Sequence, residues 1–221
     1  MKDFIIYGAG YTTKQVIADI LFTNSKMPSA LVVDEELHDE AAYYDLPIVL
    51  FSAVQKLYPP DKYDMLIITG RQVMRNREKM YLEAKKFSYH LTNYISPNAI
   101  IEHDVEMGDN NIVFSGAFIG FGGKIGSNNT IRHKAYIGHE TQIGNHNIIT
   151  ANCAVGGMSK IGNLSYIGLA STMKDRSVIG DECLIGMGSV ITKEIESYST
   201  AYGVPAKVVS HHKETGIVFD L

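Results

Sequence analysis

Large aliphatic residues recur at every sixth position through the middle of this chain. In seventeen consecutive six-residue blocks, starting at Ile95 and ending with the block that starts at Ile191, the first residue is always Ile, Val or Met. The second position is usually Gly and the fifth is mostly a small residue. Six residues match neither a 3.6-residue helix nor simple strand alternation. The pattern therefore predicts a parallel β-solenoid, built from short strands joined by tight corners.

Each residue type in the block has an expected place in such a solenoid. Three blocks form one triangular coil, and coils stack at the hydrogen-bonding spacing of about 4.8 Å. The aliphatic residue points inward, while Gly and the paired residues Asn110–Asn111 and Asn128–Asn129 favour corner conformations. Cys153 and Cys183 both occupy the small fifth position. We expect both to be buried core thiols without a disulfide.

The first 94 residues have a different pattern, in which short apolar runs alternate with helical segments. The order of these segments predicts a parallel sheet, with ligands bound at the carboxyl ends of its strands. We expect strands at 4–7, 30–33 and 65–69, and helices at 12–24, 52–58 and 73–87. The predicted units are an α/β domain at 1–94, the solenoid at 95–196 and a C-terminal tail at 197–221.

The first expected strand ends in a glycine-containing loop, Gly8-Ala9-Gly10-Tyr11-Thr12-Thr13. It has the first two glycines of the dinucleotide-binding fingerprint, but Thr13 replaces the third. A turn of this kind, at the start of a helix, permits close backbone approach to a phosphate. The sequence thus favours a nucleotide ligand over a complete dinucleotide.

Composition narrows the class of protein further. The chain has 45% hydrophobic and 20% charged residues and a net charge of −4. These values describe a soluble globular protein and give no reason to expect nucleic acid or a membrane as partner. The apolar run that follows Met1-Lys2-Asp3 is too short for a signal peptide or a membrane span. We expect a cytoplasmic protein.

Two further features complete a family resemblance. His139-Glu140 lies midway along the solenoid, and Gly203-Val204-Pro205-Ala206-Lys207 follows it. With the α/β unit and the hexads, they make the chain resemble bacterial nucleotide-amino-sugar N-acetyltransferases. It is similar to the UDP-4-amino-sugar acetyltransferase of bacillosamine synthesis and to the sialic-acid O-acetyltransferase-like group. The resemblance implies a Rossmann-like N-terminal domain, a left-handed β-helix and a homotrimer with active sites between subunits. Acetyl-CoA is the implied cosubstrate, with no metal.

The resemblance also implies roles for particular residues. His139 is the expected general base, Glu140 raises its basicity, and the amine attacks the thioester directly. The two side chains can touch only if the chain turns a corner between them. Gly157, one coil further on, is expected to leave its backbone N–H open to the reacting carbonyl. The expected nucleotide-sugar contacts are Gly8, Gly10, Tyr11, Thr12, Asp34, Glu35 and Gly70. The expected CoA contacts are His146, Leu169, Met187 and Lys207.

The match is uneven at two places. The family's usual Gly-Ala-Ser-Gly-His-Gly loop lacks its His here, since Tyr11 and Thr12 follow Gly10. A second family His, which contacts the thioester, falls at Ile148, and His146 lies two residues earlier.

Other functions remain open on the sequence alone. A sugar O-acetyltransferase would use the same residues, and a non-catalytic solenoid scaffold would need none of them. A zinc carbonic anhydrase of the β-helix type needs three His around one metal. It is disfavoured because no His follows His146 inside the solenoid. The nucleotide, the sugar and the choice between amine and hydroxyl acceptor are not fixed by these patterns.

Overall fold

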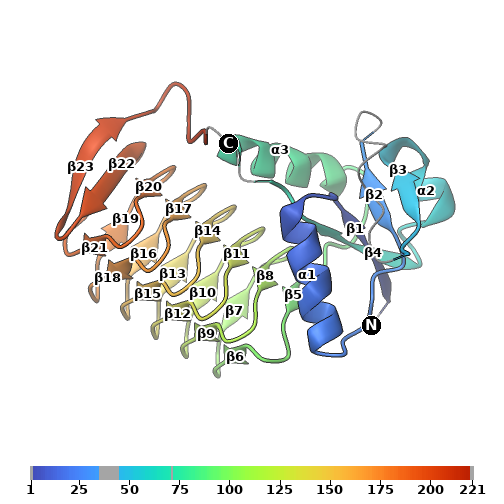
Figure 1. Ribbon diagram of the computed structural model, residues 1–221, viewed down its shortest axis with the longest axis horizontal. Helices are drawn as coiled ribbons and strands as arrows, with labels where there is room; N and C mark the ends of the chain where they lie inside the picture. Colours follow the sequence, from blue (N-terminus) through green and yellow to red (C-terminus); the bar gives the residue numbers. More distant parts are fainter. Residues whose placement is uncertain (1, 35–44, 71, 220–221) are drawn as a thin grey trace.

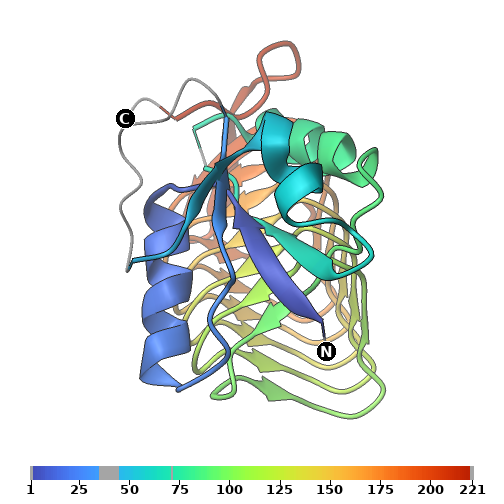
Figure 2. The same cartoon turned by 90° about the vertical axis from the view of Figure 1, so that its right-hand side faces the viewer.

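The N-terminal part of the protein is a four-stranded parallel sheet with helices on its faces. The computed structural model describes residues 2–34, 45–70 and 72–219. The strand order is β3-β2-β1-β4, and all three pairings are parallel (Figures 1 and 2). The elements are β1 (Asp3–Tyr7), α1 (Tyr11–Phe22), β2 (Leu31–Val33), β3 (Ile48–Leu50), the 3-10 turn η2 (Phe51–Ala53), α2 (Val54–Leu57), β4 (Tyr63–Ile67) and α3 (Met74–Lys85).

The predicted parallel sheet is confirmed, with differences of detail. Strand β3 was not expected, because three residues after Pro47 are too few to show a strand pattern. The helix expected at 52–58 is a 3-10 turn followed by one α-helical turn. Strand β4 begins and ends two residues earlier than expected.

The central part is a three-sided β-helix of two-residue strands. The three faces are sheets of five, eight and six strands (Figure 1). Its strands are β5 (Tyr94–Ile95), β6 (Ile100–Ile101), β7 (Glu106–Met107), β8 (Ile112–Val113), β9 (Phe118–Ile119), β10 (Lys124–Ile125), β11 (Thr130–Ile131), β12 (Tyr136–Ile137), β13 (Gln142–Ile143), β14 (Ile148–Ile149), β15 (Ala154–Val155), β16 (Lys160–Ile161), β17 (Tyr166–Ile167), β18 (Thr172–Met173), β19 (Val178–Ile179), β20 (Leu184–Ile185) and β21 (Val190–Ile191).

Strand register confirms the 18-residue coil. Ile131 pairs with Ile149, and Ile149 pairs with Ile167. All pairings between β5 and β21 are parallel, as stacking of successive coils requires. Short parallel strands repeated in three sheets fit the left-handed β-helix that the resemblance implied.

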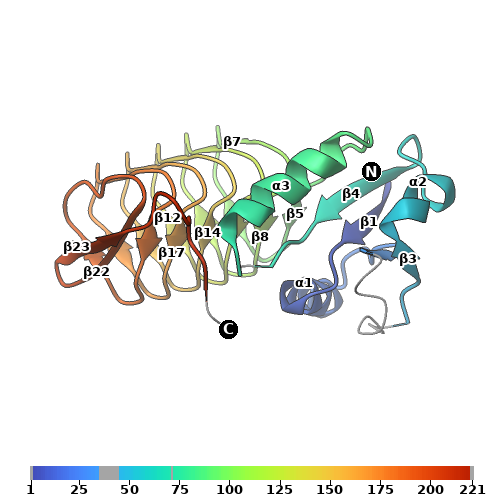
Figure 3. The same ribbon diagram turned by 90° about the horizontal axis from the view of Figure 1, so that it is seen from above.

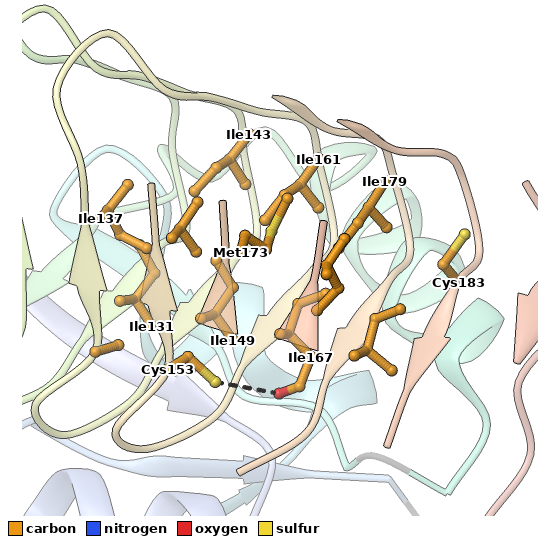
Figure 4. Packing of buried hydrophobic residues seen from close by; sticks show 14 of the residues in the cluster. Ile131, Ile137, Ile143, Ile149, Cys153, Ile161, Ile167, Met173, Ile179 and Cys183 are labelled. Carbon is orange, nitrogen blue, oxygen red and sulfur yellow. Dashed lines mark hydrogen bonds between the residues drawn. The ribbon is translucent and has the colours of Figure 1, made fainter. Parts of the chain in front are cut away.

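The aliphatic column forms the core of the β-helix, as the sequence predicts. Ile131, Ile149 and Ile167 are completely buried, and Figure 4 shows them with neighbouring isoleucines inside the prism. Burying one such side chain contributes about 1.5–3 kcal/mol. Ile95 is an exception with 40% exposure, because β5 ends its sheet and has a neighbouring coil on one side only. Cys153 and Cys183 are buried free thiols, as expected.

The three corners of the coil stack into three edges that run along the β-helix. We name each edge after one residue: the His139 edge lies between the six- and five-stranded sheets, the His146 edge between the five- and eight-stranded sheets, and the Leu169 edge between the eight- and six-stranded sheets. One residue in most corners has a positive φ, including Asn110 and Asn128. Asn111, Asn129 and Asn147 occupy the next position of successive coils and form a buried hydrogen-bonded ladder along the His146 edge.

Helix α3 packs between the N-terminal sheet and the His146 edge and is hydrogen-bonded to that edge. Arg77 is buried and donates hydrogen bonds to the carbonyl oxygens of His146 and Asn128. On the other side of the sheet, Asp19 of α1 accepts a 2.6 Å hydrogen bond from the Tyr94 hydroxyl. Both α3 and α1, which pack on the N-terminal sheet, are therefore hydrogen-bonded to the β-helix.

The C-terminal tail first extends the β-helix and then returns to α3. Strands β22 (Ser199–Gly203) and β23 (Ala206–His211) form an antiparallel hairpin beside β20. Residues 212–219, here called the C-terminal strap, then run back to the start of α3 (Figures 1 and 3). There Val218 bridges Val73, and the Met74 N–H donates to the Ile217 carbonyl.

Candidate functional site

His139 and Glu140 meet at a corner of the β-helix. Strand β12 ends at Ile137, and the chain turns through Glu140, whose φ is +54°. This turn brings His139 Nδ1 to 3.4 Å from Glu140 Oε2, so the condition set by the sequence is met. The side chains are 44% and 50% exposed, and the imidazole stacks on Phe121 with ring centroids 5.8 Å apart. The pair is therefore accessible to a ligand.

Gly157 lies directly against the imidazole, but not in the expected role. A Cβ atom added at Gly157 would stand 2.5 Å from His139 Nε2, so glycine is required for space. Its backbone N–H donates a 2.9 Å hydrogen bond to Asp175 Oδ1. The expectation of an N–H open to a carbonyl is therefore wrong for this conformation. The acceptor, Asp175, lies in the next coil, and the comparison of His139 with Gly157 alone did not take that coil into account.

A broad groove of about 800 Å³ begins at His139 and Gly157. It continues over Met158 and over cationic side chains of the next coils, among them Lys174 and Arg176. Asp175 and Glu194 line the groove as well, so its surface carries mixed charge.

A second cavity, of about 320 Å³, lies where the N-terminal sheet meets the β-helix. Four residues predicted as ligand contacts line it: Gly10, Tyr11, Thr12 and Gly70. They come from the carboxyl ends of β1 and β4 and from the start of α1, the position at which open parallel sheets bind ligands. Arg132 of the β-helix forms part of the opposite wall.

Gly8 supports this cavity without lining it. Its φ is +117°, and a Cβ atom there would collide with the carbonyl oxygen of Ile68. The Thr13 hydroxyl donates a 2.8 Å hydrogen bond to the Gly8 carbonyl. Thr13, which replaces the third glycine of the fingerprint, thus closes the loop locally.

The two acids expected near a nucleotide base are only partly described. Asp34 is exposed at the end of β2 and accepts a 2.7 Å hydrogen bond from the Tyr7 hydroxyl. Burial and the Asp34 contact raise the pKa of Tyr7, which therefore stays a neutral donor. Glu35 lies outside the described residues.

Three of the four expected CoA contacts lie near one another at the far end of the Leu169 edge. Leu169 and Met187 are exposed and 18 residues apart, so they stack on successive coils. Tyr202 extends this ridge, because its Cβ lies 2.7 Å from where a Cβ on Gly186 would stand. Lys207 of β23 pairs with Tyr202 and is exposed.

His146 is not placed for the expected contact with acetyl-CoA. Its residue exposure is 7%, and α3 covers it. His146 Nδ1 is 2.8 Å from the Asn128 amide, and its ring packs against Tyr81. Burial, with Arg77 beside it, lowers the pKa of His146 to about 4. His146 is a neutral residue of the domain junction, a role hidden in the sequence because the covering helix is distant along the chain.

Ile148, which stands where the family has its second His, packs under the C-terminal strap. It is buried with Met74 and Ile217, and Tyr166 and Phe219 lie against the same cluster. Ile217 lies outside the hexad repeat. The repeat alone therefore could not show why an apolar residue stands at position 148.

Two arginines beside the second cavity carried no sequence signal. Arg77 is 3% exposed and lines a small extension of the cavity together with Arg132. Burial, and the charge of Arg132, lower the pKa of Arg77 to about 10. Neither residue belongs to a motif, and both act across contacts between distant parts of the chain.

No helix in the described ranges is both long and apolar enough to cross a membrane. No group of three or more His, Cys, Asp or Glu side chains in those ranges is arranged to hold a metal ion.

Comparison with known proteins relates the chain to solved structures only. No protein-family model matches the sequence, and no curated protein matches it significantly. Perosamine N-acetyltransferase of Caulobacter crescentus, in complex with CoA and GDP-perosamine, superposes with a TM-score of 0.84 at 22% identity. That match covers 95% of this chain and 98% of the other.

Two more structures are similar over nearly the whole chain. The acetyltransferase domain of PglB from Neisseria gonorrhoeae, in complex with acetyl coenzyme A, has a TM-score of 0.84 at 19% identity, over 94% of this chain and 99% of that one. WeeI from Acinetobacter baumannii has a TM-score of 0.82 at 20% identity, over 95% and 100%. The expected resemblance is confirmed in structure: the chain has the fold of these hexapeptide-repeat acetyltransferases from end to end.

Proposed function

We propose that this protein is an acetyl-CoA-dependent N-acetyltransferase that acts on the amine of a nucleotide-linked amino sugar. The observation that carries the proposal is the His139–Glu140 contact, with the imidazole edge facing Gly157. It occurs on a fold shared with a perosamine N-acetyltransferase whose structure holds CoA and GDP-perosamine. A scaffold without catalytic function would need neither the pair nor the glycine beside it.

His139 acts as the general base in this mechanism. Glu140 accepts a hydrogen bond from the Nδ1–H group, which keeps the proton on Nδ1 and leaves the lone pair on Nε2 as the base. The amine nitrogen attacks the thioester carbonyl carbon, and an oxyanion forms as the new C–N bond is made. The amine proton passes to Nε2, the oxyanion collapses and the C–S bond breaks, and the imidazolium gives the proton to the sulfur so that CoA leaves as the thiol. Such a base contributes about 10²–10⁴-fold to the rate.

The acceptor binds in the cavity lined by Gly10, Tyr11, Thr12 and Gly70. The N-terminal sheet acts as a Rossmann-like nucleotide domain, and the first turn of α1 presents backbone N–H groups to a diphosphate. Asp34 stands at the end of the neighbouring strand β2, where it can reach the nucleotide base. Acetyl-CoA follows the exposed ridge of Leu169 and Met187 towards Lys207.

The site is shared between subunits of a homotrimer. Within one chain, the six-stranded sheet separates the His139 edge from the Leu169 edge, and Arg132 of the acceptor cavity belongs to the latter. The outer face of this sheet carries the exposed residues Ile100 and Tyr136, and the half-buried Phe118 ring stacks on Tyr136. Apolar side chains on such a face favour self-association. A cyclic trimer about this face brings the His139 edge of one subunit to the Leu169 edge of the next.

Product analysis tests the proposal. The protein is incubated with acetyl-CoA and amino sugars linked to UDP, dTDP or GDP, and the product is examined by mass spectrometry and NMR. The expected product carries one acetyl group on the amine nitrogen. Acetylation of a hydroxyl would contradict the N-acetyltransferase assignment. Failure to acetylate any acceptor would contradict the proposal that the protein is an acetyltransferase.

A further inference from the structure

Arg77 is a buried cation whose protein partners are all neutral. Its guanidinium donates to the carbonyl oxygens of His146 and Asn128 and to the hydroxyl oxygens of Thr69 and Thr130. Among the described residues it forms no ion pair. A buried positive charge is costly without a negative partner. Its surroundings therefore favour an anion nearby.

Arg132 places a second guanidinium beside the same space. Its Nη1 donates to Gln15 Oε1 at 2.5 Å, and the guanidinium lies over the Phe114 ring, 5.2 Å from the centroid. These contacts hold the side chain at the cavity wall, which it lines together with Thr12. The two cations face a common volume from different parts of the chain.

That volume is small and rich in hydroxyl groups. The extension holds about 30 Å³, and Thr69, Thr130 and Thr150 line it together with the two arginines. Thr69 and Thr130 accept from Arg77, and no described residue takes the proton of either hydroxyl. Each can therefore donate to a ligand atom. A space of this size suits one or two oxygen atoms.

We propose that Arg132, Thr69 and Thr130, backed by Arg77, form an anion subsite beside the acceptor cavity, where the end of β4 and helix α3 meet the β-helix. The inference rests on the proposed function, because the anion is an acidic group of the nucleotide-linked acceptor. Phosphate and carboxylate oxygens both match the guanidinium fork. The source is either the diphosphate or a carboxylate on the sugar, as in an amino uronic acid.

Equilibrium binding without acetyl-CoA tests the subsite separately from catalysis. Calorimetry compares UDP, UDP-glucose and UDP-glucuronate, and the same series with GDP and dTDP, for the wild type and Arg132→Gln. The variant is expected to bind at least about ten-fold more weakly, as loss of a charge-assisted hydrogen bond implies. Lys134→Gln is the matched control, because Lys134 is an exposed cation of the same coil outside the cavity. It should bind like the wild type.

The pattern of loss identifies the anion. An equal loss for nucleoside diphosphates and glucose conjugates assigns the diphosphate, whereas a loss confined to glucuronate conjugates assigns a sugar carboxylate. Wild-type affinity of Arg132→Gln for every probe overturns the subsite, and so does the absence of binding to the wild type. Arg132-dependent binding without acetyl transfer would leave the subsite standing and refute the proposed function. Acetyl transfer by the wild type together with unchanged binding by Arg132→Gln would refute the subsite and leave the proposed function standing.

Discussion

His139 Nε2 lies 2.5 Å from the point where a Cβ atom on Gly157 would stand. The two residues are one coil apart, so the stacking of the β-helix itself sets this approach. It determines which ring edge is available, because the opposite nitrogen, Nδ1, faces Glu140. Space at Gly157 is therefore a condition for the proposed base.

Gly157→Ala tests this condition. The added methyl group meets only the end of the imidazole, which can rotate away. We expect a folded protein with near-wild-type melting temperature but at least about ten-fold lower kcat, since the base is displaced. Steady-state kinetics and thermal denaturation measure the two effects.

The double variant His139→Ala/Gly157→Ala provides the control. With the imidazole gone, the alanine at 157 should cost no further activity, so the two losses should not add. Fully additive losses, or wild-type kcat in Gly157→Ala alone, would separate Gly157 from the base.

Mixed oligomers test whether the site is shared between subunits. His139→Ala and Arg132→Gln each impair a different edge, and neither variant should be active alone at low acceptor concentration. In a random equal mixture, half of the His139 edges and half of the Arg132 edges are intact. About a quarter of wild-type activity should return if neighbours complete each site.

The same two substitutions in one chain, mixed with wild type, serve as the reference. A mixture of single variants that stays inactive, although subunit exchange is demonstrated, would place the whole site within one chain.

The C-terminal strap should influence acceptor binding through Arg75. Arg75 donates to Glu182 and to the carbonyl oxygens of Lys213 and Glu214. The strap also binds Gln72, a residue of the cavity wall, through the Phe219 N–H. We expect Arg75→Gln to raise the acceptor KM by about five-fold and to leave the KM for acetyl-CoA unchanged.

Lys85→Gln is the control for Arg75→Gln. Lys85 lies on the same helix as Arg75 but away from the strap, and the substitution breaks its ion pair with Asp109. Equal changes in both KM values for Arg75→Gln, or a similar acceptor effect of Lys85→Gln, would contradict a positioning role for the strap.

His146 predicts a pH dependence of stability. Its pKa falls from 6.5 to about 4 on folding, so below pH 6.5 the unfolded state binds more protons. Stability from this group is complete above pH 6.5 and declines as the pH falls towards 4, by up to about 3 kcal/mol. The neighbouring charges are Arg77, Asp109 and Glu78. Urea denaturation between pH 4 and 7 should show this slope, and His146→Gln should reduce it.

His103→Gln is the matched variant, because His103 is an exposed residue of an early coil. It should keep the wild-type slope. An unchanged slope in His146→Gln would assign the acid sensitivity to other groups.

The repeat made most of the β-helix predictable, because each position faces the same environment one coil later. Ile131 and Ile149 are buried, as the period predicts, and the corner at Glu140 meets the condition under which His139 and Glu140 can touch. What the pattern missed depends on the parts of the chain that are not periodic. Helix α3 covers His146 and the C-terminal strap covers Ile148, and both lie outside the repeat. Local spacing carries no information on such contacts.

The same reason hid the polar wall of the acceptor cavity. Arg77 bonds to Thr130 across 53 positions of sequence, and Arg132 to Gln15 across 117. Only the packing of the N-terminal sheet on the β-helix brings these side chains together. The loop at Gly10, in contrast, was predictable, because the end of a parallel strand has a known place in the sheet.

Release of free CoA shows directly whether His139 serves as the base in acetyl transfer to a nucleotide-linked amino sugar. The assay follows thiol formation from acetyl-CoA with a panel of UDP-, dTDP- and GDP-linked 3-amino and 4-amino sugars, for the wild type and His139→Ala in parallel. We expect turnover with at least one nucleotide-linked amino sugar and a loss of about 10²–10⁴-fold in the variant, with unchanged folding. Equal turnover by the two proteins, or no turnover with any of these amino sugars, would contradict this mechanism.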